Sequence, residues 1–311
     1  MDNALNDVWD PPDLGGRVTV VTGGSRGVGR GVALALGSAG ATVYVTGRSS
    51  RTGQSTEGLP GTVEETAEEV TRRGGRGVAV RLDHGVPADN EALAARLASD
   101  EGGLDLLVNN AWGGYERSAE VPFDAPFWEQ PLWRYELFQT SLRAQYDVTR
   151  RLVPLMFSRP SGLVVGIGFS DGDVYLGQVG YDVFKKASDR MGRGFAHDLR
   201  KKNVAALSVH PGFVRTERVE AAWEAMGDGP ASVVHSPEYV GRAVASLLAD
   251  PAVGERSGEV LSAGDLAEEY GFTDVDGRKP PAFRLEGRMS LATRMHRLNR
   301  VVSAALSSSR P

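Results

Sequence analysis

Two side chains that can exchange and hold protons, Tyr181 and Lys185, lie four positions apart in a segment that we expect to be helical over 178–202. Residues four apart share one face of a helix, so the phenol and the ammonium lie side by side. A free tyrosine has a pKa of about 10, and a nearby ammonium lowers this pKa by stabilising the phenolate. The pair therefore predicts a general acid or base that acts on a bound oxygen atom. Because Y-x-x-x-K is a common pattern, the alternative is an amphipathic helix that carries both residues incidentally.

A glycine-rich segment, TGGSRGVG at 22–29, follows the first apolar run of the chain directly and leads into a helical pattern. Glycines at such a turn let the backbone approach a pyrophosphate, and the N-terminus of the next helix then faces the anion. The alternative is a purely structural turn, but the position after the first strand of a βαβ unit favours dinucleotide binding. The candidate cofactor residues of this loop are Gly23, Ser25, Arg26, Gly27, Val28 and Gly29.

The end of the second strand indicates which dinucleotide binds. An NAD enzyme needs an acidic residue there for the ribose 2′-hydroxyl, whereas this strand ends VTGRS at 45–49 without one. Arg48 can form a charge-assisted contact with a 2′-phosphate, and Arg26 in the glycine loop indicates the same chemistry. Either arginine alone could be a solvated surface charge, but together with the missing acid they favour NADP(H).

The elements that must position these residues alternate regularly along the chain. Seven short runs rich in β-branched residues predict strands, and their nearly continuous apolar character indicates burial on both faces. These runs lie at 17–23, 41–47, 77–83, 104–110, 161–168, 204–210 and 257–262. Helical patterns fall between them, at 28–40, 63–74, 89–99, 136–156 and 184–202. The alternation predicts a doubly wound α/β Rossmann fold with a seven-stranded parallel sheet and helices on both faces.

We divide the 311 residues into an N-terminal arm at 1–15, one dinucleotide-binding domain at 16–265 that includes the substrate pocket, and an extension at 266–311. The Gly/Ser/Thr-rich stretch 48–61 is expected to be a mobile loop, and 212–235 a lid over the cofactor. The pattern at the end of the extension predicts an amphipathic helix, with an apolar face made of Leu291, Met295, Leu298, Val302 and Ala305. This helix could make peripheral contact with a membrane, but packing on the body or on a neighbouring subunit is favoured.

Composition excludes several classes of function. Apolar residues make up 41% of the chain and charged residues 24%, with a net charge of −5, so nucleic acid is not expected as a partner. The absence of cysteine excludes disulfides and thiolate catalysis, and none of the five histidines has metal-ligand spacing, so no metal is expected. No apolar run reaches about 18 residues and the N-terminus is polar, so neither a transmembrane segment nor a targeting peptide is expected. We therefore expect a cytoplasmic protein.

Four motifs in the same order resemble the short-chain dehydrogenase/reductase family over residues 16–265. TGGSRGVG is similar to the T-G-x-x-x-G-x-G loop of that family, and LVNNA at 107–111 to its Asn-Asn-Ala-Gly segment. Tyr181 and Lys185 match its Y-x-x-x-K pair, and HPGFVRT at 210–216 resembles its Pro-Gly…Thr segment. Finer features resemble the branch of dehydrogenase/reductase member 1, namely VYVTGR, FWEQP, GLVV and DLAEEYGFTDVDGR.

The resemblance implies an NADP(H)-dependent oxidoreductase that interconverts a ketone and a secondary alcohol. Tyr181 is then the proton donor or acceptor, and Lys185 also binds the nicotinamide ribose. The resemblance further implies that Asp83 contacts the adenine amino group and that the segment of Asn110 and Ala111 lines the adenosine ribose. The residues implied to meet the nicotinamide are Pro211, Gly212, Val214 and Thr216. Members of the family are commonly dimers or tetramers, so a homo-oligomer is expected.

The chain departs from the family pattern at the residues expected beside the tyrosine. The stretch that should hold the carbonyl-polarising serine reads IGFS at 167–170, so Ser170 lies one position late and can be catalytic only if the loop is rearranged. The family asparagine is also missing, with Gln139 or Ser141 in its region, and Trp112 replaces a glycine. Losing one carbonyl donor can cost on the order of a hundredfold in rate. The alternative function is therefore an NADP(H)-binding protein with little turnover, acting as a redox-responsive regulator or assembly subunit.

Aromatic residues gather on the segments expected at the carboxyl ends of the strands, where a substrate binds beside the nicotinamide. Some of them belong to the core, but their clustering predicts an apolar pocket for a small carbonyl or hydroxy substrate. The related branch implies ketones such as steroids or xenobiotic carbonyls. The aromatic set comprises Trp112, Tyr115, Phe123, Phe127, Trp128, Trp133, Phe169, Tyr175 and Trp223.

Overall fold

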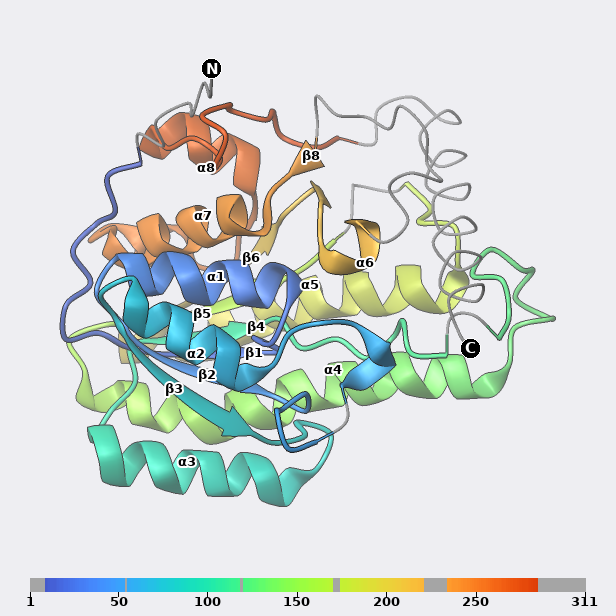
Figure 1. Cartoon of the computed structure of the whole chain (residues 1–311), viewed down its shortest axis with the longest axis horizontal. Helices are drawn as coiled ribbons and strands as arrows, with labels where there is room; N and C mark the ends of the chain where they lie inside the picture. The colour runs from blue at the N-terminus through green and yellow to red at the C-terminus, as the bar shows by residue number, and fades with distance from the viewer. Residues whose placement is uncertain (1–8, 54, 118–119, 170–173, 221–233, 285–311) are drawn as a thin grey trace.

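The computed structural model describes residues 9–53, 55–117, 120–169, 174–220 and 234–284. Its centre is a seven-stranded parallel sheet in the order β3-β2-β1-β4-β5-β6-β9 (Figure 1). The strands are β1 (Val18–Thr22), β2 (Thr42–Gly47), β3 (Arg76–Arg81), β4 (Leu106–Asn109), β5 (Gly162–Ile167), β6 (Val204–His210) and β9 (Val260–Ser262). The predicted doubly wound fold with seven parallel strands is therefore confirmed.

Helices cover both faces of this sheet (Figure 1). One face carries α1 (Gly27–Ser38), α2 (Val63–Arg72) and α7 (Pro237–Ala249), with α8 (Ala263–Tyr270) beside α7. The other face carries α3 (Pro87–Glu101), α4 (Leu132–Leu152) and α5 (Val179–Leu199). Successive strand residues alternate between the two cores, so that Val21 packs on the α1 side and Val20 on the α4 side. Burial on both faces explains why the strands are apolar throughout.

Local sequence signals and close helix packing fix the helices on the α1 side of the sheet. α2 starts with a capping box, in which the Thr62 hydroxyl accepts from the Glu65 amide and the Glu65 carboxylate accepts from the Thr62 amide. α1 and α7 touch backbone to backbone, because a Cβ on Gly31 would lie 2.2 Å from the carbonyl carbon of Pro237. This close packing fixes α1 and, with it, the glycine loop at its N-terminus.

The strand order reverses between β1 and β4. β1 pairs with β2 on one side and with β4 on the other, so that Val21 is level with both Val45 and Val108. In doubly wound sheets such a switch point opens a crevice at the carboxyl ends of the strands. The loop after β1, the loop after β4 and the N-terminus of α1 therefore meet in one place.

The structure adds elements that the sequence did not predict and shifts one boundary. β7 (Phe213–Val214) and β8 (Val234–His235) pair as a separate short parallel sheet. The predicted boundary at 265 falls inside α8, and the following chain stays on the domain: Phe272 is 3% exposed in the main core. The predicted C-terminal amphipathic helix lies in 285–311, outside the described residues. Within the described ranges, none of the helices is long and apolar enough to cross a membrane.

Candidate active site

The glycine loop between β1 and α1 takes a shape that only glycine permits. Gly23 and Gly27 have φ of +66° and +56°, in the left-handed region where other side chains are strained. Gly29 has an ordinary φ, but a Cβ there would lie 2.2 Å from the Gly23 carbonyl oxygen. Asn110, directly after β4, donates to the carbonyls of Thr22 and Gly23 at 2.9 and 3.0 Å and so holds the loop. A ligand can therefore approach the backbone closely at the N-terminus of α1.

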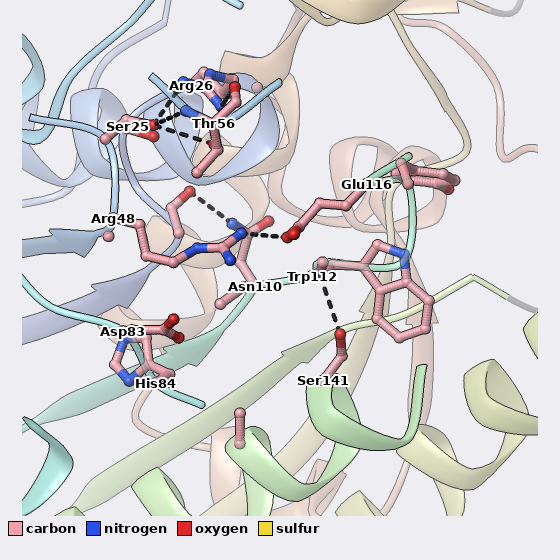
Figure 2. A pocket seen from close by; sticks show the side chains of 18 of the residues that line it. Ser25, Arg26, Arg48, Thr56, Asp83, His84, Asn110, Trp112, Glu116 and Ser141 are labelled. Atoms are coloured by element: carbon pink, nitrogen blue, oxygen red, sulfur yellow. Dashed lines mark hydrogen bonds and ion pairs between the residues drawn. The ribbon is translucent and has the colours of Figure 1, made fainter. Parts of the chain in front are cut away.

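This loop forms one wall of a cavity of 470 Å³ (Figure 2). Predicted cofactor residues that lie far apart in the chain come together along it. Those that line the cavity are Gly23, Ser25, Arg26, Gly27, Val28, Arg48, Asp83, Asn110, Ala111 and Thr216. Gly29 contributes through its packing on Gly23 rather than as a lining residue.

A carboxylate already contacts the glycine loop. Glu217, in the short helix α6 (Glu217–Glu220), accepts a hydrogen bond from the Gly27 amide at 2.8 Å. This amide lies in the first turn of α1, where the helix dipole favours negative charge. The carboxylate of Glu217 thus stands in for a phosphate oxygen, and the loop fits the pyrophosphate of a dinucleotide. The sequence did not predict this contact, because 190 positions separate the two residues.

Arg48 reaches into the cavity and forms an ion pair with Glu116 (Figure 2). Both side chains stay partly accessible, 37% for Arg48 and 25% for Glu116. An acid is therefore present beside Arg48 although β2 does not end in one, because the loop between β4 and α4 supplies it. The absence of an acidic residue at the end of β2 is therefore weaker evidence for NADP(H) than the sequence indicated. A 2′-phosphate has to displace Glu116 before it can bind Arg48.

Arg26 has a different environment from the one predicted. Its guanidinium donates to the hydroxyls of Ser49 and Thr56 at 2.8 Å and to the Pro60 carbonyl at 2.9 Å. These bonds tie the loop after β2, which contains the 3-10 helix η1 (Thr56–Gly58), to the N-terminus of α1. With its donors used in this way, Arg26 fits a structural role better than contact with a 2′-phosphate.

Ser141 on α4 forms part of the opposite wall of the cavity (Figure 2). Its hydroxyl accepts from the Gly113 amide at 3.1 Å and donates to the Leu137 carbonyl at 2.9 Å. Of the two residues predicted near the missing asparagine, Ser141 therefore faces the cavity, whereas Gln139 is exposed. Ser141 positions the loop that carries Trp112.

Tyr181 lies in the first turn of α5, inside a cluster of aromatic rings. The ring centroids of Phe123, Trp112 and Phe138 lie 5.3, 6.0 and 6.1 Å away, and only 7% of Tyr181 is exposed. The Tyr181 hydroxyl lies 3.0 Å from the hydroxyl of Tyr115. Burial, and then the Tyr115 hydroxyl, raise the pKa of Tyr181 well above its usual value. The phenol is therefore protonated at neutral pH.

Lys185 follows one turn later and is also buried. Its ammonium lies 4.0 Å from the centroid of the Trp112 ring and 5.6 Å from that of the Tyr181 ring. Burial lowers the pKa of Lys185 to about 8, and the charge of Asp189 partly opposes this shift. The sequence predicted that Lys185 lowers the pKa of Tyr181. The structure reverses that direction, because the ammonium faces Trp112 and burial dominates at the phenol.

The space next to Gly168, in the IGFS stretch at 167–170, is filled by other side chains. A Cβ on Gly168 would lie 2.7 Å from both Asp189 Oδ1 and His210 Nε2, and these two atoms are 3.1 Å apart. A carboxylate–imidazole pair therefore occupies the direction in which a side chain at 168 would point. Phe169 joins the aromatic cluster. Ser170, the predicted catalytic serine, lies outside the described residues.

The segment expected to meet the nicotinamide runs from the end of β6 through β7. Gly212 turns the chain with φ of +85°, and Val214 is buried in β7. Pro211, Gly212 and Val214 do not line the cavity, whereas Thr216, two residues beyond Val214, does. Of the predicted lid at 212–235, the part from 221 to 233 lies outside the described residues.

The predicted aromatic residues divide between the cluster around Tyr181 and the surface. Trp112, Tyr115, Phe123 and Phe169 belong to the cluster, together with Phe138. Phe127 and Trp128 are 65% and 72% exposed, so they do not form part of an enclosed pocket. Trp133 packs under the Arg117 guanidinium, Tyr175 is half exposed, and Trp223 lies outside the described residues.

Known proteins are similar to this chain in sequence and in fold. The family model for short chain dehydrogenase matches residues 17–227. Dehydrogenase/reductase SDR family member 1 of Mus musculus is 37% identical over 276 residues, which cover 85% of this chain and 84% of that protein. A short chain dehydrogenase from Mycobacterium thermoresistibile has a similar structure, with a TM-score of 0.73 at 24% identity over 89% of this chain and 100% of that one.

A second solved structure is 7α-hydroxysteroid dehydrogenase complexed with NADH and 7-oxo glycochenodeoxycholic acid. Its TM-score is 0.64 at 22% identity, and the match covers 90% of this chain and 99% of that one. At this identity the likeness shows the fold alone. The family model and the identity to the mouse protein show more: this chain belongs to the short-chain dehydrogenase/reductase family of oxidoreductases, in the branch of family member 1, and that family binds a nicotinamide dinucleotide.

Proposed function

We propose that this chain is an NADP(H)-dependent oxidoreductase that interconverts a ketone and a secondary alcohol. The observation that carries the proposal is the place of Tyr181. A protonated phenol stands among aromatic rings, and the Tyr115 hydroxyl that it contacts lines the anion-binding cavity. When bound there, a nicotinamide supplies reversible hydride transfer. The 7-oxo compound bound to the related hydroxysteroid dehydrogenase is itself a ketone, which supports this substrate class.

In the direction of reduction, Tyr181 is the acid. Its O–H bond breaks, the proton passes to the substrate oxygen, and the electron pair stays on the phenolate. The raised pKa of Tyr181 keeps the phenol protonated at neutral pH, which is the state that reduction requires. The buried Lys185 ammonium, one turn away, stabilises the phenolate that forms. Oxidation runs the same path in reverse and needs the phenolate, so alkaline pH favours it.

Arg48 supports NADP(H) rather than NAD(H). It lines the cavity, and a doubly charged 2′-phosphate competes well with the single carboxylate of Glu116 for its guanidinium. We also propose the remaining cofactor contacts: Asp83 to the adenine, Asn110 and Ala111 to the adenosine ribose, and the 211–216 segment, of which Thr216 lines the cavity, to the nicotinamide. Arg26 supports the loop beside them.

The aromatic cluster supports a small apolar carbonyl or hydroxy compound as substrate, in preference to a charged metabolite. We further propose that the protein is a cytoplasmic homo-oligomer, a dimer or tetramer like other members of the family. Analytical ultracentrifugation and cell fractionation test these two statements. The comparisons give no support to the alternative of a regulator with little turnover.

The decisive experiment is NADPH oxidation in the presence of cyclohexanone, acetophenone or a 7-oxo steroid, with wild type and Tyr181→Phe compared. We expect wild-type turnover of at least one ketone and a loss on the order of a thousandfold in the variant, because the general acid is removed. Tyr146→Phe, an exposed tyrosine on α4, is the matched control and should retain full activity. If the wild type binds NADPH but reduces no ketone faster than Tyr181→Phe, the proposed function is wrong.

A further inference from the structure

Tyr115 sits on the boundary between the cavity and the buried catalytic phenol. It belongs to the loop between β4 and α4 and lines the cavity, whereas Tyr181 does not. The two hydroxyls are 3.0 Å apart, and the two ring centroids are 6.1 Å apart at a tilt of 37°. Among the described residues, Tyr115 supplies the one recorded hydrogen bond of the Tyr181 hydroxyl. Tyr115 therefore connects the lining of the cavity to the Tyr181 hydroxyl through one hydrogen bond.

We propose that Tyr115 is a second catalytic residue, whose hydroxyl donates a hydrogen bond to the same substrate oxygen that Tyr181 protonates. This inference rests on the proposed function. A carbonyl oxygen has two lone-pair directions and can accept from two donors at once. Two hydroxyls already within hydrogen-bond distance of each other can both reach one oxygen at about 2.7 Å. The substrate oxygen then replaces the bond that the two tyrosines make with each other.

The proton balance follows from the difference between the two phenols. Tyr181 loses its proton to the substrate oxygen and keeps the electron pair; a bound reduced nicotinamide would supply the hydride that the carbonyl carbon needs. Tyr115 keeps its own proton throughout. Before transfer, its O–H stabilises the negative charge that develops on the substrate oxygen. After transfer, it can turn to the new Tyr181 phenolate, with which it is already in contact.

The neighbourhood of Gly168 shows why such a donor is needed. Asp189 and His210 fill the direction in which a side chain at 168 would point, so no hydroxyl from that position can reach the substrate. Tyr115 comes from a different segment, the loop after β4, which is the strand next to β5 in the sheet. Its ring packs near Phe123, at a centroid distance of 6.5 Å, and near the Arg218 guanidinium, 5.3 Å from its centroid. These contacts help to hold the ring in place.

The test separates the hydroxyl of Tyr115 from its ring. Tyr115→Phe removes the hydroxyl and keeps the packing, Tyr115→Leu removes both, and Tyr146→Phe is the exposed control. With the best ketone of the panel and saturating NADPH, we expect kcat to fall on the order of a hundredfold in Tyr115→Phe, as for loss of one oxyanion donor. NADPH binding should be unchanged in that variant, and Tyr115→Leu should lose at least as much activity.

Three other outcomes would contradict either the catalytic role of Tyr115 or the proposed function. If Tyr115→Phe has the kcat of the wild type and only Tyr115→Leu is impaired, the ring merely packs in the cluster and the second catalytic role is wrong. If Tyr115→Phe changes KM alone, the hydroxyl binds substrate in the ground state and does not act on the developing charge, which also overturns the proposal. If the wild type itself reduces no ketone, it is the proposed function that fails, and this role with it.

Discussion

The two ends of the active-site cavity are held in shape by different means. At the glycine-loop end, Gly23, Gly27 and Gly29 set the backbone, and the groups offered to a ligand are main-chain amides. At the aromatic end, Tyr115 lines the cavity and the Tyr181 hydroxyl is buried 3.0 Å behind the Tyr115 hydroxyl, among rings from the β4–α4 loop, α4 and α5. At the glycine-loop end, a few glycine positions tolerate almost no substitution. At the aromatic end, many ring contacts together hold the hydroxyls in place, so a single group can be removed while the others keep their positions.

The largest effect on cofactor binding is expected from a substitution that fills the glycine-loop end. A Cβ at Gly29 would lie 2.2 Å from the carbonyl oxygen of Gly23, which is backbone and cannot move aside without moving β1. Gly29→Ala should therefore weaken NADPH binding by on the order of a hundredfold or more and lower the melting temperature. Fluorescence titration and thermal unfolding measure the two effects.

The matched control is Gly194→Ala in α5. A Cβ at Gly194 meets nothing within 4 Å, so this change should leave binding intact and stabilise the helix by about 0.5–1 kcal/mol. Wild-type affinity for NADPH in Gly29→Ala would show that the backbone of the loop adapts, and the contrast between the two ends would disappear.

The difference between the two ends also explains which features of the site could be predicted from the sequence. Gly23 and Gly29 belong to one short motif, and Tyr181 and Lys185 are one helical turn apart, so the local pattern was enough to identify them. The seven apolar runs predicted all seven strands of the main sheet, because each strand is buried on both faces. What could not be predicted are the contacts between distant segments.

Four examples show this limit. Glu217 on the Gly27 amide, Glu116 on Arg48, Tyr115 on Tyr181 and Asp189 beside Gly168 all depend on where loops settle after folding. Each of these contacts changes the interpretation of a residue that the sequence did identify. The reversed pKa direction of Tyr181 is the clearest case, since burial and a neighbour 66 positions away outweigh the lysine on the same helix.

At the aromatic end we also expect a pH dependence, smaller than the losses expected for Tyr181→Phe and Tyr115→Phe. Burial lowers the pKa of Lys185 to about 8, so the ammonium is present below that pH and is lost as the pH rises through it. If the charge is needed beside the phenolate, the rate of ketone reduction should fall roughly tenfold between pH 7 and pH 9. Initial rates at saturating substrates across this range measure the falling limb.

A substitution on the same helix tests whether Lys185 causes the fall in rate between pH 7 and pH 9. The negative charge of Asp189 raises the pKa of Lys185, so Asp189→Asn should lower this pKa and move the falling limb to lower pH. Asp198→Asn, on the exposed end of α5, should leave the limb where it is. An identical limb in Asp189→Asn and wild type would mean that another group controls the rate.

Substitutions of Arg48 and Arg26 should differ in their effect on the preference for NADPH over NADH. Arg48→Ala should weaken NADPH about fivefold relative to NADH, a modest loss because the guanidinium must first leave Glu116. Arg26→Ala loosens the loop of Ser49 and Thr56, which lies beside the site for both cofactors, so it should weaken NADPH and NADH equally. Equal effects in Arg48→Ala, or a selective effect in Arg26→Ala, would reverse the roles assigned here.

The smallest effect is expected where a side chain imitates the ligand. Glu217 holds the Gly27 amide that a pyrophosphate needs, and a neutral amide side chain competes for it less strongly than a carboxylate. Glu217→Gln should therefore tighten NADPH and NADH alike, by about threefold, since both carry the same pyrophosphate. Glu220→Gln is the control, because Glu220 pairs with Arg215 on the exposed side of the same short helix. Weaker binding in Glu217→Gln would mean that the carboxylate supports the bound state, and the glycine-loop end would then depend on a side chain as much as the aromatic end does.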